Sequence, residues 1–482
     1  MIDILSVGLA QLVSYVLMYA FTWYITQTFS PDVLGVYFLV FAIVSGAFVF
    51  AKWGYGQGVL RFCSQIVRVN NDACRSVYGY SIKRVVFNSL FICTALIAFS
   101  KQVALIYKLP GLAPALIFLT PYILLRSVNE LAIQYLRIWG RIRLFTLIQY
   151  LLVPASKLLI LYLAVLFLFK LDIRSIITGI IASELIAAII LAITTGSFAD
   201  FLLSFQKKIP FSNEDSKYLN YIGFNLICVF MFERSDIILS SYFLSSNDIA
   251  IYQVGKQVSW IVTIILAGFE PIIAPAIARA VGEGDKNKLS LGFGVSVYYI
   301  SLLSIPIAVC LFINGDLILS FFGEYYKKGL WPMRILIIGQ MINFLTGQVG
   351  YILNMSGHGK VVLYNALGTV FLTIIFIAIL CPLWGVIGVA TAVGMSIALI
   401  NLVRIWQVWY LEKIEFLCID KIVKLFCLIL ISTGLFSLQH LWAANLIGLI
   451  ATCLIFYSTI CCIEYYKNHN NIEILNDFIN LK

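Results

Sequence analysis

The sequence predicts an all-α polytopic membrane protein with about fourteen transmembrane helices. Two observations lead to this fold class: 61% of the 482 residues are hydrophobic and only 12% are charged, and the mean hydropathy is +0.97. A bilayer core about 30 Å thick takes roughly 20 apolar residues per helical crossing, so the length allows about a dozen or more spans. The longest polar stretches, 196–217 and 282–290, are shorter than the roughly 50 residues of a small domain. The composition therefore excludes a soluble globular enzyme.

The spans are predicted from apolar runs bounded by charge, Pro or Gly. They cover residues 4–29, 33–51, 82–107, 112–136, 144–169, 174–195, 218–243, 249–278, 290–313, 330–354, 361–381, 384–408, 420–439 and 441–466. The even number places both termini on the same side of the membrane.

Basic residues predict which side that is, because short loops rich in Lys and Arg stay in the cytoplasm. Of the 33 Lys and Arg residues, 22 fall on the side of the termini, 7 fall on the opposite side and 4 lie within spans. Both termini are therefore expected in the cytoplasm. The asymmetry also explains the net charge of +10, and a nucleic-acid partner is not expected.

The longest cytoplasmic segment, residues 52–83, has Arg61, Arg68 and Arg75 at sevenfold spacing with apolar residues between them. On a helix this spacing gathers the arginines on one face, which is typical of a helix lying in the lipid headgroup layer. Arg61 and Arg68 are therefore candidates for a cytoplasmic entrance that meets lipid phosphates. A positively charged topology anchor explains the same pattern equally well.

Two pairs of segments suggest an internal repeat. Residues 29–37 (FSPDVLGVY) resemble residues 244–252 (LSSNDIAIY), and residues 135–143 resemble residues 351–360 at nearly the same displacement. A displacement of six spans preserves orientation, which indicates parallel repeats. The predicted organisation is an N-lobe (1–195), a cytoplasmic linker (196–217), a C-lobe (218–410), two added spans (411–466) and a cytoplasmic tail (467–482).

Charged residues in mid-span are costly, and they either pair with one another or face a hydrated cavity. Both explanations are open here: buried pairs such as Arg126 with Glu130 fix helix packing, or a chamber binds an anion and couples its movement to an ion. Neither the 11 cysteines nor the three histidines have the spacing of a metal site. For the chamber, the candidate anion ligands are Arg126, Lys157, Arg234 and Lys256, and the candidate ion-coupling residues are Glu130, Glu184, Glu233 and Asp236.

Several segments resemble a known family. Residues 30–37 (SPDVLGVY) followed by 54–61 (GYGQGVLR), residues 339–360, and residues 382–390 (PLWGVIGVA) are similar to the polysaccharide transporters. These are the Wzx-type O-antigen flippases of the multidrug/oligosaccharidyl-lipid/polysaccharide (MOP) exporter superfamily. The resemblance covers about residues 4–410, and cationic cavity residues are typical of these flippases.

The resemblance implies two six-helix lobes forming a V, in a bacterial inner membrane. By alternating access such a protein moves an undecaprenyl-diphosphate-linked oligosaccharide, the repeat unit of O-antigen, capsule or exopolysaccharide, from the cytoplasmic to the outer leaflet. The near balance of carboxylates and basic residues departs from a purely cationic lumen, so only the diphosphate is required to be anionic. No cofactor is expected, coupling to H⁺ or Na⁺ is open, and membrane lipids and other polysaccharide assembly proteins are the expected partners.

Two alternatives have discriminating features. The cavity of an ion-coupled multidrug or metabolite exporter of the same superfamily is expected to contain carboxylates and no arginines. A membrane polymerase or ligase of polysaccharide assembly needs a sizeable outward loop with catalytic Arg or His, and the outward loops here are short. The sequence has no nucleophile–base pair or phosphate-loop motif, so a non-enzymatic secondary transporter is the prediction.

Overall fold

The computed structural model describes residues 2–66, 70–168, 172–196, 212–414, 419–438, 445–467, 474–475 and 477–479. These residues form helices joined by short turns, with no strand in the described ranges. The chain divides into two compact units, Met1–Ala250 and Ile251–Lys482. The predicted lobe boundaries remain a prediction.

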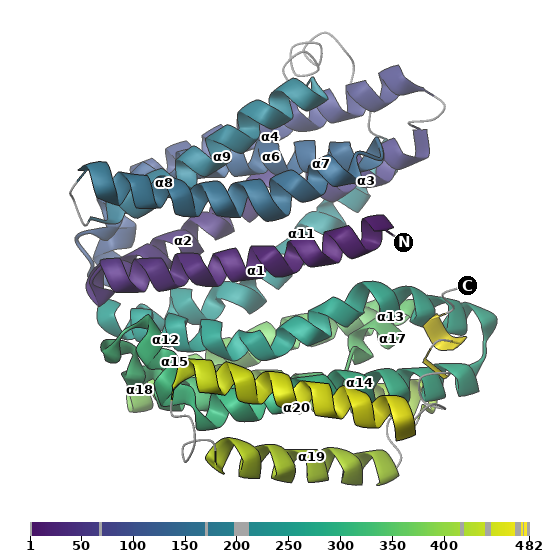
Figure 1. The fold of residues 1–482 in the computed structure, drawn as a ribbon. Helices are drawn as coiled ribbons and strands as arrows, with labels where there is room; N and C mark the ends of the chain where they lie inside the picture. Colours follow the sequence, from purple (N-terminus) through teal and green to yellow (C-terminus); the bar gives the residue numbers. More distant parts are fainter. Residues whose placement is uncertain are drawn as a thin grey trace. The chain divides into compact units, whose positions relative to one another are not determined.

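The first unit, purple to teal in Figure 1, contains a helical bundle. Its helices are α1 (Ile2–Thr28), α2 (Pro31–Lys52), α3 (Tyr55–Ile66), α4 (Asn71–Tyr107), α5 (Leu112–Leu119), α6 (Pro121–Ile138), α7 (Ile142–Thr146), a π-helical turn η1 (Leu147–Leu152), α8 (Val153–Leu168), α9 (Ile173–Thr195) and α11 (Asn213–Ser240). Helix α12 (Ser246–Ser259) begins in this unit and ends in the second.

The second unit, green to yellow in Figure 1, continues from α12. Its helices are η2 (Trp260–Thr263), α13 (Ile264–Glu283), α14 (Lys286–Ile313), α15 (Gly315–Phe322), η3 (Glu324–Gly329), α16 (Leu330–Thr346), α17 (Val349–Met355), α18 (Gly359–Glu412), α19 (Ile419–Leu438) and α20 (Leu446–Lys467).

Each predicted span falls on one of these helices or on a run of them, which confirms the all-α polytopic membrane class. Among the described residues, nine helices are long and apolar enough to cross a membrane, or ten when the bent pair α16–α17 is one span. The other predicted spans are not counted separately, for reasons that lie in their helices. Helix α11 carries several charges, α18 contains two predicted spans joined at Gly385, and the apolar parts of α19 and α20 are short.

The interior of the first unit is organised around α6, which packs against α2, α3, α4 and α9. Helix α3 is amphipathic, and Val59 and Cys63, one turn apart, are buried against Tyr78 and Tyr135. The rings of Tyr78 and Tyr135 stack with centroids 3.9 Å apart. Burial of this apolar face packs α3 against the rest of the helical bundle.

The predicted single interfacial helix over residues 52–83 is wrong. Helix α3 ends at Ile66 and α4 begins separately, with the Asn70 side chain accepting a hydrogen bond from the Ala73 amide. The Asn70 side chain thus supplies an acceptor for the Ala73 amide, which in an unbroken helix would donate to a backbone carbonyl of the preceding turn. Arg61 and Arg75 therefore lie on different helices.

The glycines of residues 54–58 allow α11 to approach the turn between α2 and α3. A Cβ on Gly54 would overlap the Leu219 carbonyl oxygen. A Cβ on Gly223 would lie 2.5 Å from the nearest atom of the Trp53 ring. Trp53 itself has a φ of 45°, and its indole Nε1 donates to Asn220 Oδ1 at 3.0 Å. The glycine-rich segment is thus a packing surface for α11.

A similar close approach occurs at the start of α2. A Cβ on Gly35 would lie 1.8 Å from the Ser246 carbonyl oxygen, and the Ser246 hydroxyl donates to Asp32 Oδ1 at 2.8 Å. We expect Gly35→Ala to lower the free energy of unfolding by about 1–3 kcal/mol, because backbone atoms must move to relieve the overlap. Thermal unfolding of the purified protein in detergent measures this. Gly8→Ala is the control, since a Cβ at Gly8 meets nothing within 4 Å; equal stability of both variants would contradict the contact.

Helix α14 is the central helix of the second unit. Its most apolar window is 72% buried, and it packs against α13, α16, α19 and α20. Helices α16 and α18 cross at a glycine contact, where a Cβ on Gly339 would lie 2.8 Å from the Gly394 Cα. Small residues at such crossings let helix backbones approach closely in membranes.

Candidate functional site

Four charged side chains of the first unit form a chain across α2, α6 and α9. Arg126 Nη1 lies 3.4 Å from Glu184 Oε1, Arg126 Nη2 lies 3.8 Å from Glu130 Oε2, and Lys52 Nζ lies 3.7 Å from Glu130 Oε1. Asn129 Nδ2 donates to Glu184 Oε2 at 2.8 Å and to the Glu184 carbonyl at 2.9 Å. Glu184 is 4% exposed, so its charge depends on these partners. Arg126 thus has two carboxylate partners, as the pairing alternative expects.

Two other predicted anion ligands, Lys157 on α8 and Arg234 on α11, lie around one aromatic ring. Lys157 Nζ is 5.8 Å and Arg234 Cζ is 5.9 Å from the centroid of Phe41, and Lys157 Nζ is 3.8 Å from the Phe21 centroid. In the described part of the chain neither cation forms an ion pair within 4 Å. Cation–π contacts compensate only part of the desolvation of a charge. The pair is therefore suited to bind an anion.

The backbone before Lys157 is irregular. The π-helical turn Leu147–Leu152 directly precedes α8, in which Pro154 lies near the first turn. Such turns occur often at functional sites because they leave backbone groups outside the regular ladder. The helix is therefore irregular from Leu147, before Pro154 is reached.

Lys256, the fourth predicted anion ligand, belongs to the second unit. It is 5% exposed, and its Nζ lies 5.2 Å from the Trp260 ring. The structure therefore brings Arg126, Lys157 and Arg234 into one unit and describes Lys256 in the other.

The predicted coupling carboxylates have different surroundings. Glu130 and Glu184 are held in the charge chain, whereas Asp236 is 1% exposed and accepts a hydrogen bond from the Ile237 amide at 2.9 Å. Glu233 is exposed on the same helix, α11. Their role in coupling stays a prediction.

At the predicted cytoplasmic entrance, Arg61 is exposed on α3 and stacks on Tyr218, with its Cζ 3.9 Å from the ring centroid. Arg68, the other entrance residue, lies outside the described residues. The structure adds a nearby cavity that the sequence analysis did not identify.

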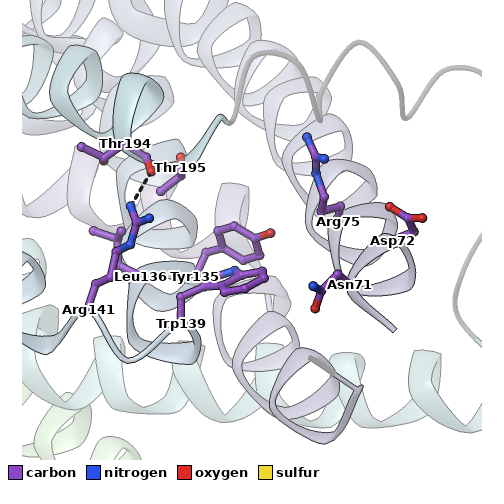
Figure 2. Close-up of a pocket in the computed structure, with 9 residues that line it drawn as sticks. All are labelled: Asn71, Asp72, Arg75, Tyr135, Leu136, Trp139, Arg141, Thr194 and Thr195. Carbon is purple, nitrogen blue, oxygen red and sulfur yellow. Dashed lines mark hydrogen bonds between the residues drawn. The ribbon is translucent and has the colours of Figure 1, made fainter. Parts of the chain in front are cut away.

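This cavity, of about 320 Å³, lies at the ends of four candidate spans. Figure 2 shows Tyr135 and Trp139 between Arg141 on one side and Arg75 on the other, with Asp72 beyond Arg75. Arg141 Nη1 donates to the Thr194 carbonyl at 3.0 Å. The start of α4, the end of α6, the start of the Ile142–Phe167 span and the end of α9 surround it, so the cavity lies where four candidate spans begin or end. We call it the rim pocket; Arg75 and Arg141 are the basic residues that line it.

The described residues contain no group of three His, Cys, Asp or Glu side chains that could hold a metal ion. The helical fold and its long apolar helices define the molecule as a multi-pass membrane protein.

Comparisons with known proteins identify the fold. The MatE family model matches residues 222–380, about a third of the chain. A structure of the lipid II flippase MurJ in an inward closed conformation aligns at a TM-score of 0.72 and 12% identity, covering 96% of this chain and 98% of that one. A multidrug resistance MATE family transporter of the MOP superfamily, in an inward-facing conformation, aligns at 0.66 and 12% identity, covering 86% and 94%.

A third structure, of a MOP superfamily transporter from Pyrococcus furiosus, aligns at a TM-score of 0.60 with 12% identity and covers 90% of this chain and 96% of that one. No curated protein sequence matches the chain. The chain therefore has the fold of MOP superfamily transporters, a multi-pass membrane fold.

Proposed function

We propose that the protein is a secondary transporter of the MOP superfamily that flips an undecaprenyl-diphosphate-linked oligosaccharide from the cytoplasmic to the outer leaflet. The observation that carries the proposal is the pair Lys157 and Arg234, two cations of the first unit that contact aromatic rings and, among the described residues, form no ion pair within 4 Å. A diphosphate supplies the missing counter-charge, and its polyprenyl tail stays in the bilayer. The similarity in fold to a lipid II flippase supports this substrate class.

The remaining residues have distinct roles in this mechanism. Arg61 and the rim pocket collect the diphosphate headgroup at the cytoplasmic boundary, and Lys157 and Arg234 hold it during alternating access. Arg126 keeps α6 and α9 together through Glu184 and Glu130. A proton or sodium ion at one of the buried carboxylates couples the return step.

The environment follows from this proposal. The protein spans a bacterial inner membrane with both termini in the cytoplasm, and it works beside other proteins of polysaccharide assembly. An ion-coupled multidrug exporter is the alternative within the fold. Its cationic substrates would be repelled by Lys157 and Arg234, so the charge around Phe41 favours the lipid-linked anion.

Depletion of the protein in its own cells tests the proposal. We expect lipid-linked oligosaccharide to accumulate on the cytoplasmic leaflet while its synthesis continues, which labelling with a membrane-impermeant lectin before and after lysis detects. An unchanged distribution, together with increased sensitivity to cationic drugs, would support the exporter instead.

For the rim pocket we predict an effect on substrate capture that is separate from the maximal transport rate. We expect Arg141→Gln to raise the substrate concentration for half-maximal transport severalfold and to leave the maximal rate near that of the wild type, because the pocket acts before the bilayer step. Initial rates in proteoliposomes over a range of lipid-linked substrate measure this. Arg174→Gln, at the other end of α9, is the matched control, since Arg174 is exposed and forms only a surface ion pair with Asp172 at 3.8 Å. A reduced maximal rate alone would contradict capture at the rim.

A further inference from the structure

A cavity of about 460 Å³ with both polar and apolar lining lies in the second unit, among residues of candidate membrane spans. Its size falls in the range of small-molecule sites, roughly 300–1,000 Å³. Several polar side chains placed close together inside a membrane cost free energy unless they bind a partner. The polar and aromatic residues that line it are Thr263, Glu270, Asn343, Gln348, Tyr351, Asn354, Asn401 and Arg404.

The cavity lies where two spans lose regular helical structure. The 3₁₀ turn Trp260–Thr263 interrupts the path from α12 to α13, and α16 and α17 meet at a bend of 45°. At this bend Gly347 has a φ of 64°, which an L side chain rarely adopts. Broken helices of this kind line substrate sites in transporters, because their freed backbone groups need polar surroundings.

Gln348 connects the two breaks and leaves an acceptor unused. Its Nε2 donates to the Leu266 carbonyl on α13 at 3.1 Å, while its buried Oε1 has no hydrogen-bond partner among the described residues. The side chain is 7% exposed and lines the cavity. A buried carbonyl oxygen without a donor costs free energy, so a ligand that donates to it is favoured.

The neighbouring amides are fixed in position by one another. Asn401 Nδ2 donates to Asn343 Oδ1 at 3.1 Å, and Asn343 Nδ2 donates to Gln340 Oε1 at 3.1 Å. Each side-chain amide has both donors and acceptors, and the hydrogen bonds between them fix their positions. This side of the cavity therefore presents donors and acceptors in a rigid arrangement. The cavity is thus preorganised for a ligand that both donates and accepts.

The charges of the cavity are balanced and unpaired. Glu270 and Arg404 both line it, and within the described ranges neither forms an ion pair within 4 Å. The buried Nε of Arg404 also has no partner there. An anion such as diphosphate would leave Gln348 Oε1 without a donor and would be repelled by Glu270, and a metal cation would be repelled by Arg404.

We propose that this cavity binds an uncharged, hydroxyl-rich sugar. Sugar hydroxyls donate to Gln348 and Glu270 and accept from Arg404 and the amides, so every unused group gains a partner, and the Tyr351 ring offers an apolar face for a pyranose. The inference rests on the proposed function in one respect: it takes this sugar to be the glycan of the lipid-linked substrate.

Saturation-transfer NMR on the full chain in lipid nanodiscs tests the cavity directly. The probes are soluble neutral oligosaccharides containing glucose, galactose, rhamnose and N-acetylglucosamine. We expect wild-type protein to saturate the ring protons of at least one of them, and Gln348→Leu to reduce the effect at least fivefold. Asn354→Ala, at an exposed position of the lining, gives a second variant whose folding is less at risk. Gln102→Leu, at an exposed position of α4, is the matched control and should leave the signal unchanged.

Other outcomes overturn the proposal. These are failure of every oligosaccharide to bind the wild type, equal signals for wild type and both cavity variants, and Gln348-dependent binding of sodium or inorganic pyrophosphate in place of sugar. The two proposals fail separately. Sugar binding that needs Gln348, without flipping in liposomes, would contradict the proposed function alone; flipping without such binding would contradict the cavity alone.

Discussion

We expect the double variant Lys157→Gln, Arg234→Gln to transport lipid-linked oligosaccharide about 100-fold more slowly than the wild type, and each single variant about tenfold more slowly. Each cation contributes a charge-assisted hydrogen bond to the diphosphate, worth about 1.5–3 kcal/mol, and about 1.4 kcal/mol is a factor of ten. Glutamine keeps the approximate size and polarity of each side chain and removes the charge. The measurement is the rate of surface polysaccharide export in cells that depend on the protein, at matched protein abundance.

Two controls separate charge from packing. Lys157→Arg keeps the cation beside Phe21 and should retain most of the transport, whereas Lys101→Gln removes an exposed cation of α4 and should have no effect. Wild-type export by the double variant would show that the anion binds elsewhere.

We expect Glu184→Ala to lower the free energy of unfolding by about 3–5 kcal/mol. The change removes the carboxylate that faces Arg126 at 3.4 Å and accepts from Asn129 at 2.8 Å, so a buried guanidinium loses a main counter-charge. Unfolding in mixed detergent micelles measures the loss. Adding Arg126→Met to Glu184→Ala should restore part of the stability, because the Arg126 charge, left with Glu130 as its carboxylate partner, is then also removed.

The matched control is a surface ion pair. Glu283→Ala removes the partner of Lys288, whose Nζ lies 3.1 Å from Glu283 Oε2 in an exposed pair, and should cost less than about 1 kcal/mol. A similar small cost for Glu184→Ala would mean that Arg126 is well hydrated, and the alternative of a water-filled chamber at Arg126 would then be favoured.

Hydropathy alone predicted the membrane class and placed a helix at every expected span, because apolar length is a property of local sequence. It could not predict where helices break. The π-helical turn Leu147–Leu152, the bend after Thr346 and the separation of α3 from α4 depend on tertiary packing and capping. The sevenfold arginine spacing was consequently assigned to one helix that the chain does not form.

The candidate site was predicted in part for a similar reason. Mid-span charge identified Arg126, Glu130 and Glu184, yet the pairing of Arg126 with a carboxylate 58 residues away depends on how α6 and α9 pack. Lys52, placed at the start of a cytoplasmic segment, proved to be the end of the same charge chain. The amides around Gln348 carry no charge and so gave no signal in a search for buried ions.

The most direct test of the central claim uses purified protein in liposomes that contain undecaprenyl-diphosphate-linked oligosaccharide with a fluorescent sugar. A membrane-impermeant quencher added outside reports how much sugar lies in the outer leaflet over time. The account predicts that wild-type protein makes the inner-leaflet sugar accessible and that the Lys157→Gln, Arg234→Gln variant does so about 100-fold more slowly. Equal rates for wild type, variant and protein-free liposomes would contradict it.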